Sequence, residues 1–128
     1  MRVIKVEPGR DSYVDDIPDD LDEFRKYLGG YVDDVPLGGR VIAWVNDEGI
    51  LHGLPWNRQL PGPTPLAGNI LICCIDDGGN NVEVPESLVG HVQHFFDHEC
   101  QRMNPTPSSI EEYERIAGRP AISFEEWP

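Results

Sequence analysis

The chain has 128 residues, of which 23 are Asp or Glu and 10 are Lys or Arg, so its formal net charge at pH 7 is −13. This length suits one domain with one core, and the charge excludes a general nucleic-acid binder, because Lys and Arg supply most nonspecific affinity for phosphates. The charge also disfavours anionic membranes, and without a membrane-length apolar run or the apolar core of a signal peptide, we expect a cytoplasmic protein.

Strands and one short helix are predicted for the beginning of the chain. Residues 2–6 are rich in β-branched residues and stop at a Pro-Gly turn, and residues 13–17 form a short second strand that a proline ends. A helix is predicted over Leu21 to Leu28, with Asp19 or Asp20 as its cap and a Gly-Gly pair at its end.

The middle of the chain predicts a small meander. Residues 31–37 and 40–45 form a hairpin around two glycines, and Ile50 and Leu51 return antiparallel after a turn. Residues 60–65 are rich in proline and are expected to form a stiff surface loop. Residues 69–75 are almost wholly apolar without alternation, which is typical of a central strand covered on both faces.

The longest helix is predicted to begin at Pro85 and to stop before Asn104. A proline-rich linker follows, and the capping-box pattern at Ser109 begins a short helix that ends near Gly118. The last residues are acidic and extended but keep three large apolar side chains. These are Ile122, Phe124 and Trp127.

The predicted fold class is therefore α+β. We expect a small mixed, mainly antiparallel sheet, with a short helix and one long C-terminal helix packed on it, plus a C-terminal arm. Residues 1–103 form the single domain, and residues 104–128 form the linker, the short helix and the acidic tail. The tail is too apolar for a disordered segment, so it folds back on its own domain, binds a partner or exchanges between protomers.

Arg58 is the candidate for function. It is the only Lys or Arg between Arg40 and Arg102, a stretch with eight acidic residues. Its guanidinium can pair with a carboxylate or phosphate, Trp56 offers a stacking face, and Asn57 can donate and accept hydrogen bonds. These groups suit a small anionic ligand, but the alternative is an internal salt bridge, because a lone arginine usually pairs with acidic neighbours. The predicted ligand-binding residues are Trp56, Asn57, Arg58, Asn46 and His52.

Three histidines, His91, His94 and His98, share one stripe of the long helix. They could hold a metal or sense pH, but this stripe lies apart from the apolar face of the helix, so we interpret it as an exposed polar face. We therefore predict no metal site and no cofactor.

The chain lacks the common catalytic motifs. The adjacent carboxylates Asp15-Asp16, Asp33-Asp34 and Asp76-Asp77 have diverging side chains, and we interpret them as solvated turns. No catalytic residue is predicted, and the case for an enzyme is weak. Cys73, Cys74 and Cys100 form no CxxC pair and are expected to be reduced and structural.

Several short motifs resemble, in their order, the domain-of-unknown-function 3846 family over roughly residues 1–77. They are Val6-Glu7-Pro8-Gly9, Leu28-Gly29-Gly30-Tyr31-Val32, Val35-Pro36-Leu37, Asn46-Asp47-Glu48-Gly49 and, as the most specific, Gly53-Leu54-Pro55-Trp56-Asn57-Arg58. The resemblance implies a small α+β domain found in phages, plasmids and bacteria, without an established activity.

This context and the isolated arginine together give two functional hypotheses. The first is a phage or mobile-element protein that counters host defence by binding and sequestering a small anionic, nucleotide-derived signal, without catalysis. The second is an inhibitor whose acidic surface and C-terminal arm cover a host defence protein. In either case we expect a homo-oligomer that does not bind nucleic acid directly.

Overall fold

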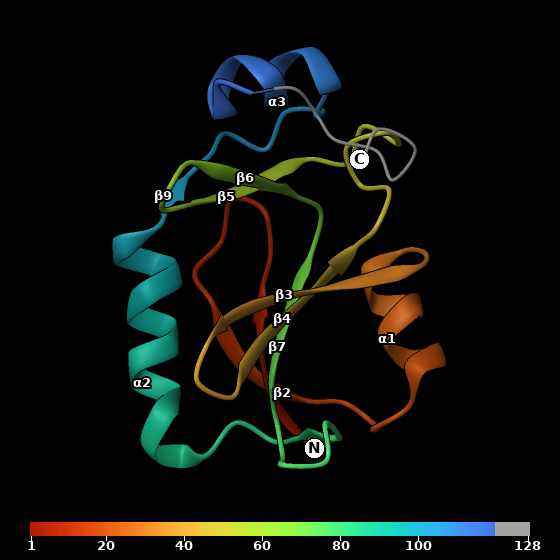
Figure 1. Ribbon diagram of the computed structural model, residues 1–128, viewed down its shortest axis with the longest axis vertical. Helices are drawn as coiled ribbons and strands as arrows, with labels where there is room; N and C mark the ends of the chain where they lie inside the picture. Colours follow the sequence, from red (N-terminus) through yellow and green to blue (C-terminus); the bar gives the residue numbers. More distant parts are fainter. Residues whose placement is uncertain (120–128) are drawn as a thin grey trace.

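The computed structural model describes residues 1–119, which form two antiparallel sheets and a few short helices (Figure 1). The chain is α+β, as predicted. Its strands are β1 (Arg2–Val6), β2 (Tyr13–Asp16), β3 (Val32–Gly38), β4 (Val41–Asn46), β5 (Trp56–Leu60), β6 (Thr64–Ala67), β7 (Ile70–Ile75), β8 (Asn81–Val82) and β9 (Gln101–Arg102). Its helices are α1 (Leu21–Leu28), α2 (Glu86–His94), the π-helical turn η1 (Phe95–Glu99) and α3 (Ile110–Ala117).

The larger sheet has six strands in the order β2-β1-β7-β4-β3, with β8 beside one end of β7. Strand β7 lies between β1 and β4, and five of its six residues are buried. The central, doubly covered strand predicted from its apolar run is therefore confirmed. Every pairing among residues 1–119 is antiparallel, so the sheet that we expected to be mixed is antiparallel throughout this part of the chain.

Each face of this sheet carries its own core. Alternate residues of β1 and β7 point to opposite faces, so Val3 and Leu71 pack with Phe24 of α1, whereas Ile4 and Ile72 belong to the other cluster, which includes Phe96. That second cluster also takes in apolar residues of the smaller sheet. Figure 1 shows α1 and α2 on opposite sides of the sheet.

The two capped helices agree with the sequence. The side chain of Asp20 accepts a hydrogen bond from the Asp22 N–H at the start of α1, and Gly29 ends the helix with φ 83°, a left-handed conformation that glycine adopts without strain. At α3, the Ser109 hydroxyl accepts from the Glu112 N–H, as the capping box predicts. Local sequence signals were enough to locate both helices.

The helix predicted to run from Pro85 to Asn104 is shorter, and that prediction was wrong at its C-terminal end. After α2 the chain makes the π-helical turn η1, in which the Cys100 N–H donates to the Phe95 carbonyl, and it then leaves to pair β9 with β5. An α-helix would bond the Cys100 N–H to the Phe96 carbonyl, but that carbonyl accepts a hydrogen bond from Arg58 Nε at 2.9 Å. The side chain of a distant strand thus accounts for the wider turn.

Residues 47–67 differ from the prediction in two respects. Ile50 and Leu51 lie in a run of turns and form no strand. The loop expected over residues 60–65 is only a tight turn over 61–63, because residues 56–60 and 64–67 form β5 and β6 of a smaller sheet with the order β6-β5-β9. Proline is tolerated at position 65 because β6 is an edge strand. Arg58 lies on β5, the central strand of this sheet.

Beyond β9 the described chain folds back on the smaller sheet. The Trp56 N–H donates to the Thr106 carbonyl at 3.0 Å, and the Ser108 N–H donates to the Leu54 carbonyl at 3.1 Å. Helix α3 then lies against β6 (Figure 1). The apolar tail residues Ile122, Phe124 and Trp127 lie outside the described residues. No helix in residues 1–119 is both long and apolar enough to span a membrane.

Candidate functional site

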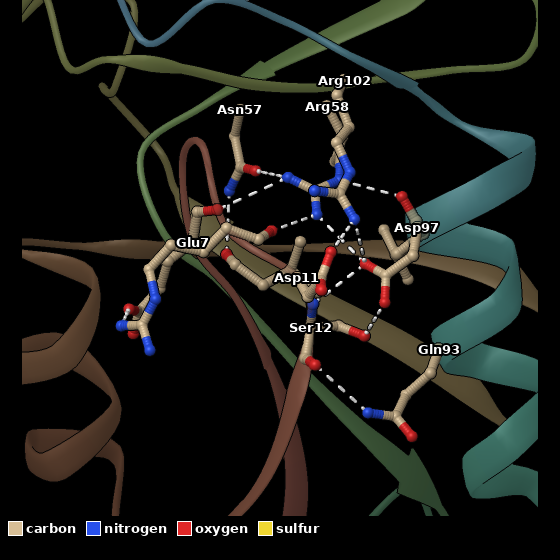
Figure 2. A network of polar contacts seen from close by, with 11 residues as sticks. Glu7, Asp11, Ser12, Asn57, Arg58, Gln93, Asp97 and Arg102 are labelled. Carbon is tan, nitrogen blue, oxygen red and sulfur yellow. Dashed lines mark hydrogen bonds and ion pairs between the residues drawn. The ribbon is translucent and has the colours of Figure 1, made fainter.

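Arg58 lies at the centre of a buried polar network that joins three parts of the chain (Figure 2). Its side chain is 0% exposed, and each of its nitrogens donates to an internal acceptor. Its partners are the Phe96 carbonyl at 2.9 Å, Asn57 Oδ1 at 3.0 Å, the Glu7 carbonyl at 3.4 Å, the Arg10 carbonyl at 2.6 Å and Asp97 Oδ1 at 3.1 Å. Burial lowers the pKa of Arg58, while the carboxylate of Asp97 opposes that shift.

Asp97 supplies the counter-charge. Ser12 donates to it twice, from its N–H at 2.9 Å and from its hydroxyl at 2.7 Å. Burial alone would raise the pKa of Asp97, but these bonds and the Arg58 ion pair outweigh burial and hold the pKa below its ordinary value. Arg102 approaches the same carboxylate at 3.7 Å from the solvent side and pairs with Asp11.

Asn57 is also fully buried, and it connects the network to the larger sheet. Its Nδ2 donates to the Val6 carbonyl and to the Gly68 carbonyl, each at 2.8 Å. Arg58 and Asn57 together tie β5 to the end of β1 and to η1. The internal salt bridge that the sequence left open for Arg58 is formed, and a ligand could reach these two side chains only after this network had opened.

The other predicted site residues lie elsewhere. Trp56 is 1% exposed, and its indole Nε1 donates to Glu112 Oε2 of α3 at 2.8 Å. Asn46 is buried, where Nδ2 donates to the Leu28 carbonyl and Oδ1 accepts from the Glu48 N–H. His52 is exposed, with Nε2 2.9 Å from Glu48 Oε2. The structure thus brings Asn57 and Arg58 together, places Asn46 and His52 around Glu48, and turns Trp56 towards α3.

A polar recess lies beside Trp56, between the smaller sheet and α3. Its volume is about 350 Å³. Two arginines with exposed side chains line it: Arg102, and Arg115, whose guanidinium is 3.2 Å from Glu112. The remaining lining residues are Trp56, Gln59, Gln101, Met103, Asn104, Thr106, Glu112 and Ile116.

The sequence did not reveal this recess, because its two arginines lie in segments that were predicted to be the end of the long helix and the short helix after the linker. One signal was available. After Arg58 the only Lys or Arg residues of the chain are Arg102, Arg115 and Arg119, all within its last 27 residues. Clustering of the scarce cations of an acidic chain is a feature that sequence reasoning can use.

A second, more apolar hollow of about 490 Å³ lies near the end of β1, where Pro8, Pro55 and Pro105 contribute to its walls. Glu7 also lines it, and its carboxylate accepts hydrogen bonds from the hydroxyls of Tyr13 at 2.6 Å and Tyr27 at 2.7 Å. Burial and the bond to Glu7 raise the pKa of Tyr13 to about 12 and that of Tyr27 further. Burial raises the pKa of Glu7, but the tyrosine bonds outweigh it and keep the pKa below its ordinary value.

The histidine stripe is exposed. The rings of His94 and His98 are 5.1 Å apart between centroids, and His94 Nε2 is 3.6 Å from Glu99. Within residues 1–119, no group of three or more His, Cys, Asp or Glu side chains is arranged to hold a metal ion.

Comparison with known proteins gives one result. The model of a family described as "Domain of unknown function (DUF3846)" matches residues 1–97, which extends twenty residues beyond the resemblance seen in the sequence and ends at Asp97. No curated protein and no solved structure gives a match. The Arg58–Asp97 pair thus lies within the matched region, whereas both arginines of the recess lie after it. Since the match covers most of the chain, this protein belongs to the DUF3846 family.

Proposed function

We propose that this protein binds and holds a small anionic ligand, without catalysis, in the recess between β5, β9 and α3. The observation that supports the proposal is the convergence of Arg102 and Arg115 on one recess in a chain whose net charge is −13. Arginine pairs with phosphate or carboxylate oxygens through two parallel N–H donors. Arg102 is paired with Asp11 and Arg115 with Glu112, so an anion in the recess would bind by replacing or sharing these carboxylate partners.

The other lining groups favour a nucleotide-derived ligand. Amides from Gln59, Gln101 and Asn104 can donate to and accept from the polar edge of a base or a sugar. Met103 and Ile116 provide an apolar surface for the face of a base. The volume of about 350 Å³ falls within the range of about 300–1,000 Å³ that small-molecule sites occupy.

The resemblance to a family found in phages and plasmids suggests what such binding would achieve. A protein that retains a nucleotide-derived signal lowers the free concentration of that signal, and this would blunt a host defence that depends on it. Sequestration requires only binding, which agrees with the absence of a common catalytic motif from the sequence.

Isothermal titration calorimetry tests this proposal. Inorganic phosphate, nucleoside monophosphates and cyclic dinucleotides would be titrated into the wild type and into Arg115→Ala. Arg40→Ala is the matched control, since Arg40 is also exposed and paired with one carboxylate, Asp77, but does not line the recess. We expect Arg115→Ala to weaken binding at least tenfold and Arg40→Ala to leave it unchanged. No binding by any compound, or equal losses in both variants, would reject the recess as the site.

A second candidate function, inhibition of a partner protein through an acidic surface, rests on the distribution of charge. Carboxylates concentrate along both outer strands of the larger sheet and at the start of α1. They are Asp15, Asp16, Asp19, Asp20, Asp22, Glu23, Asp33 and Asp34. Because β2 and β3 are opposite edges of the sheet, this charge extends around the domain, and such a distribution suits a basic partner and would accelerate its association.

This candidate is tested by neutralising carboxylates on that surface. Asp16→Asn/Asp22→Asn/Asp34→Asn would be compared with Asp77→Asn/Glu86→Gln/Glu99→Gln, which removes the same charge elsewhere. In pull-downs from host lysate, a partner that depends on the acidic surface is lost only with the first triple variant. Equal retention by both variants would count against the candidate.

A further inference from the structure

The outer strands of the six-stranded sheet, β2 and β3, each have one edge without a neighbouring strand. Such an edge presents a row of N–H and C=O groups to which another extended chain can pair. In an antiparallel ladder, alternate residues direct these groups towards the neighbouring strand and away from it. The register therefore identifies the N–H groups that an added strand would need.

On β3, the Asp47 N–H donates to the Tyr31 carbonyl, so residues 31, 33 and 35 face β4, and Val32, Asp34 and Pro36 face outwards. The outward N–H of Asp34 donates to Asp33 Oδ1 at 2.9 Å. Pro36 has no N–H to offer. Before the register shift that follows Pro36, only the N–H of Val32 is directed outwards without an acceptor among the described residues.

Strand β2 repeats this arrangement. Met1 and Ile17 exchange two hydrogen bonds, of 3.0 and 3.1 Å, so that the odd-numbered residues of β2 face β1 and the even-numbered ones face outwards. The outward N–H of Asp16 donates to Asp15 Oδ1 at 2.8 Å, and the residue at position 18 is proline. Just before the start of β2, the Ser12 N–H donates to Asp97 Oδ1. Of the outward N–H groups of β2, only that of Val14 has no acceptor in the described part of the chain.

We infer that Asp15 and Asp33 act as edge caps: the carboxylate of each occupies an outward N–H of its own strand. Together with Pro18 and Pro36, they protect both edges of the larger sheet from the addition of another strand. An incoming strand bonds to every second residue of the edge, and each edge offers it only one free N–H. A second copy of this chain, or an extended peptide, could still donate to the outward carbonyls but would find one N–H on each edge, too few for a continuous ladder of paired bonds. The homo-oligomer predicted from the sequence would have to form through another surface.

This inference gives two of the adjacent aspartate pairs a role that solvated turns do not explain. In each pair, the carboxylate of the first residue covers the outward amide of the second. The charge also repels the approach of a like strand, because both edges are acidic.

The test compares Asp33→Ala/Pro36→Val with Asp33→Asn/Pro36→Val. Both variants lose the same charge and gain the same N–H at position 36, but only asparagine keeps an oxygen that can accept the Asp34 N–H. We expect the alanine variant to at least double the weight-average mass of the protein in sedimentation equilibrium, and the asparagine variant to increase it less. An unchanged mass for a folded alanine variant would overturn the inference.

A measurement on the wild type covers the case in which the variants do not fold. Amide proton temperature coefficients from NMR should place Asp16 and Asp34 among the hydrogen-bonded amides, and Val14 and Val32 among the solvent-exposed ones. If all four amides behave as exposed, the caps do not exist and the inference fails.

Discussion

Replacing Arg58 with Met tests whether the buried network is a main determinant of stability. Methionine reproduces the unbranched chain of arginine as far as Nε, so it keeps the packing of that stem but removes every donor of the guanidinium. Asp97, whose side chain is 12% exposed, would lose its nearest counter-charge, and Asn57 Oδ1 and the carbonyls of Phe96, Glu7 and Arg10 would lose a donor. Breaking a buried ion pair by removing one partner costs about 3–5 kcal/mol. A domain of this size has only about 5–15 kcal/mol of unfolding free energy in total.

Urea unfolding followed by tryptophan fluorescence measures this loss. With an m-value of about 1.5 kcal/mol/M, the midpoint should fall by about 2–3 M. Arg40→Met is the matched control, because Arg40 and Asp77 form a pair at the surface, where loss of an ion pair costs less than about 1 kcal/mol. A loss of less than about 1 kcal/mol in Arg58→Met would refute the structural role, and Arg58 would again be available as a ligand-binding residue.

Two further predictions follow from the buried ionisable groups. Asp97 and Glu7 have pKa values below the ordinary range, so they stabilise the fold above about pH 4, and this contribution is lost as the pH falls through their folded-state values. In urea unfolding at pH 7, 5 and 3, the free energy of unfolding should fall only in the acidic range. This fall should be smaller in Asp97→Asn than in the wild type. A free energy of unfolding that rose on acidification would contradict the prediction. Cys73, Cys74 and Cys100 are buried, and burial raises the pKa of Cys73 and Cys100 to about 11, so a disulfide reagent at pH 8 should modify them only after unfolding. Rapid reaction of the native protein would show that these thiols are accessible.

Local patterns were sufficient to predict α1, α3 and the central strand β7. The caps at Asp20 and Ser109 act within one helical turn, and the apolar run of β7 reports its burial on both faces directly. These signals depend on neighbours in the sequence, so no knowledge of the tertiary structure is needed to read them. The end of α2 could not be predicted in this way. The donor that bonds to the Phe96 carbonyl is the side chain of Arg58 on β5, 38 residues earlier in the chain.

The sequence by itself determined that Arg58 is exceptional, because a lone cation among eight acidic residues must find an anion. Only the tertiary structure decided that the anion is Asp97, since folding brings η1, β5 and the residues after β1 around one guanidinium. It also decided where cations remain accessible, by placing Arg102 and Arg115 on one recess although thirteen positions separate them in the chain. Burial and the convergence of distant segments are properties of the packed chain, and no local pattern encodes them.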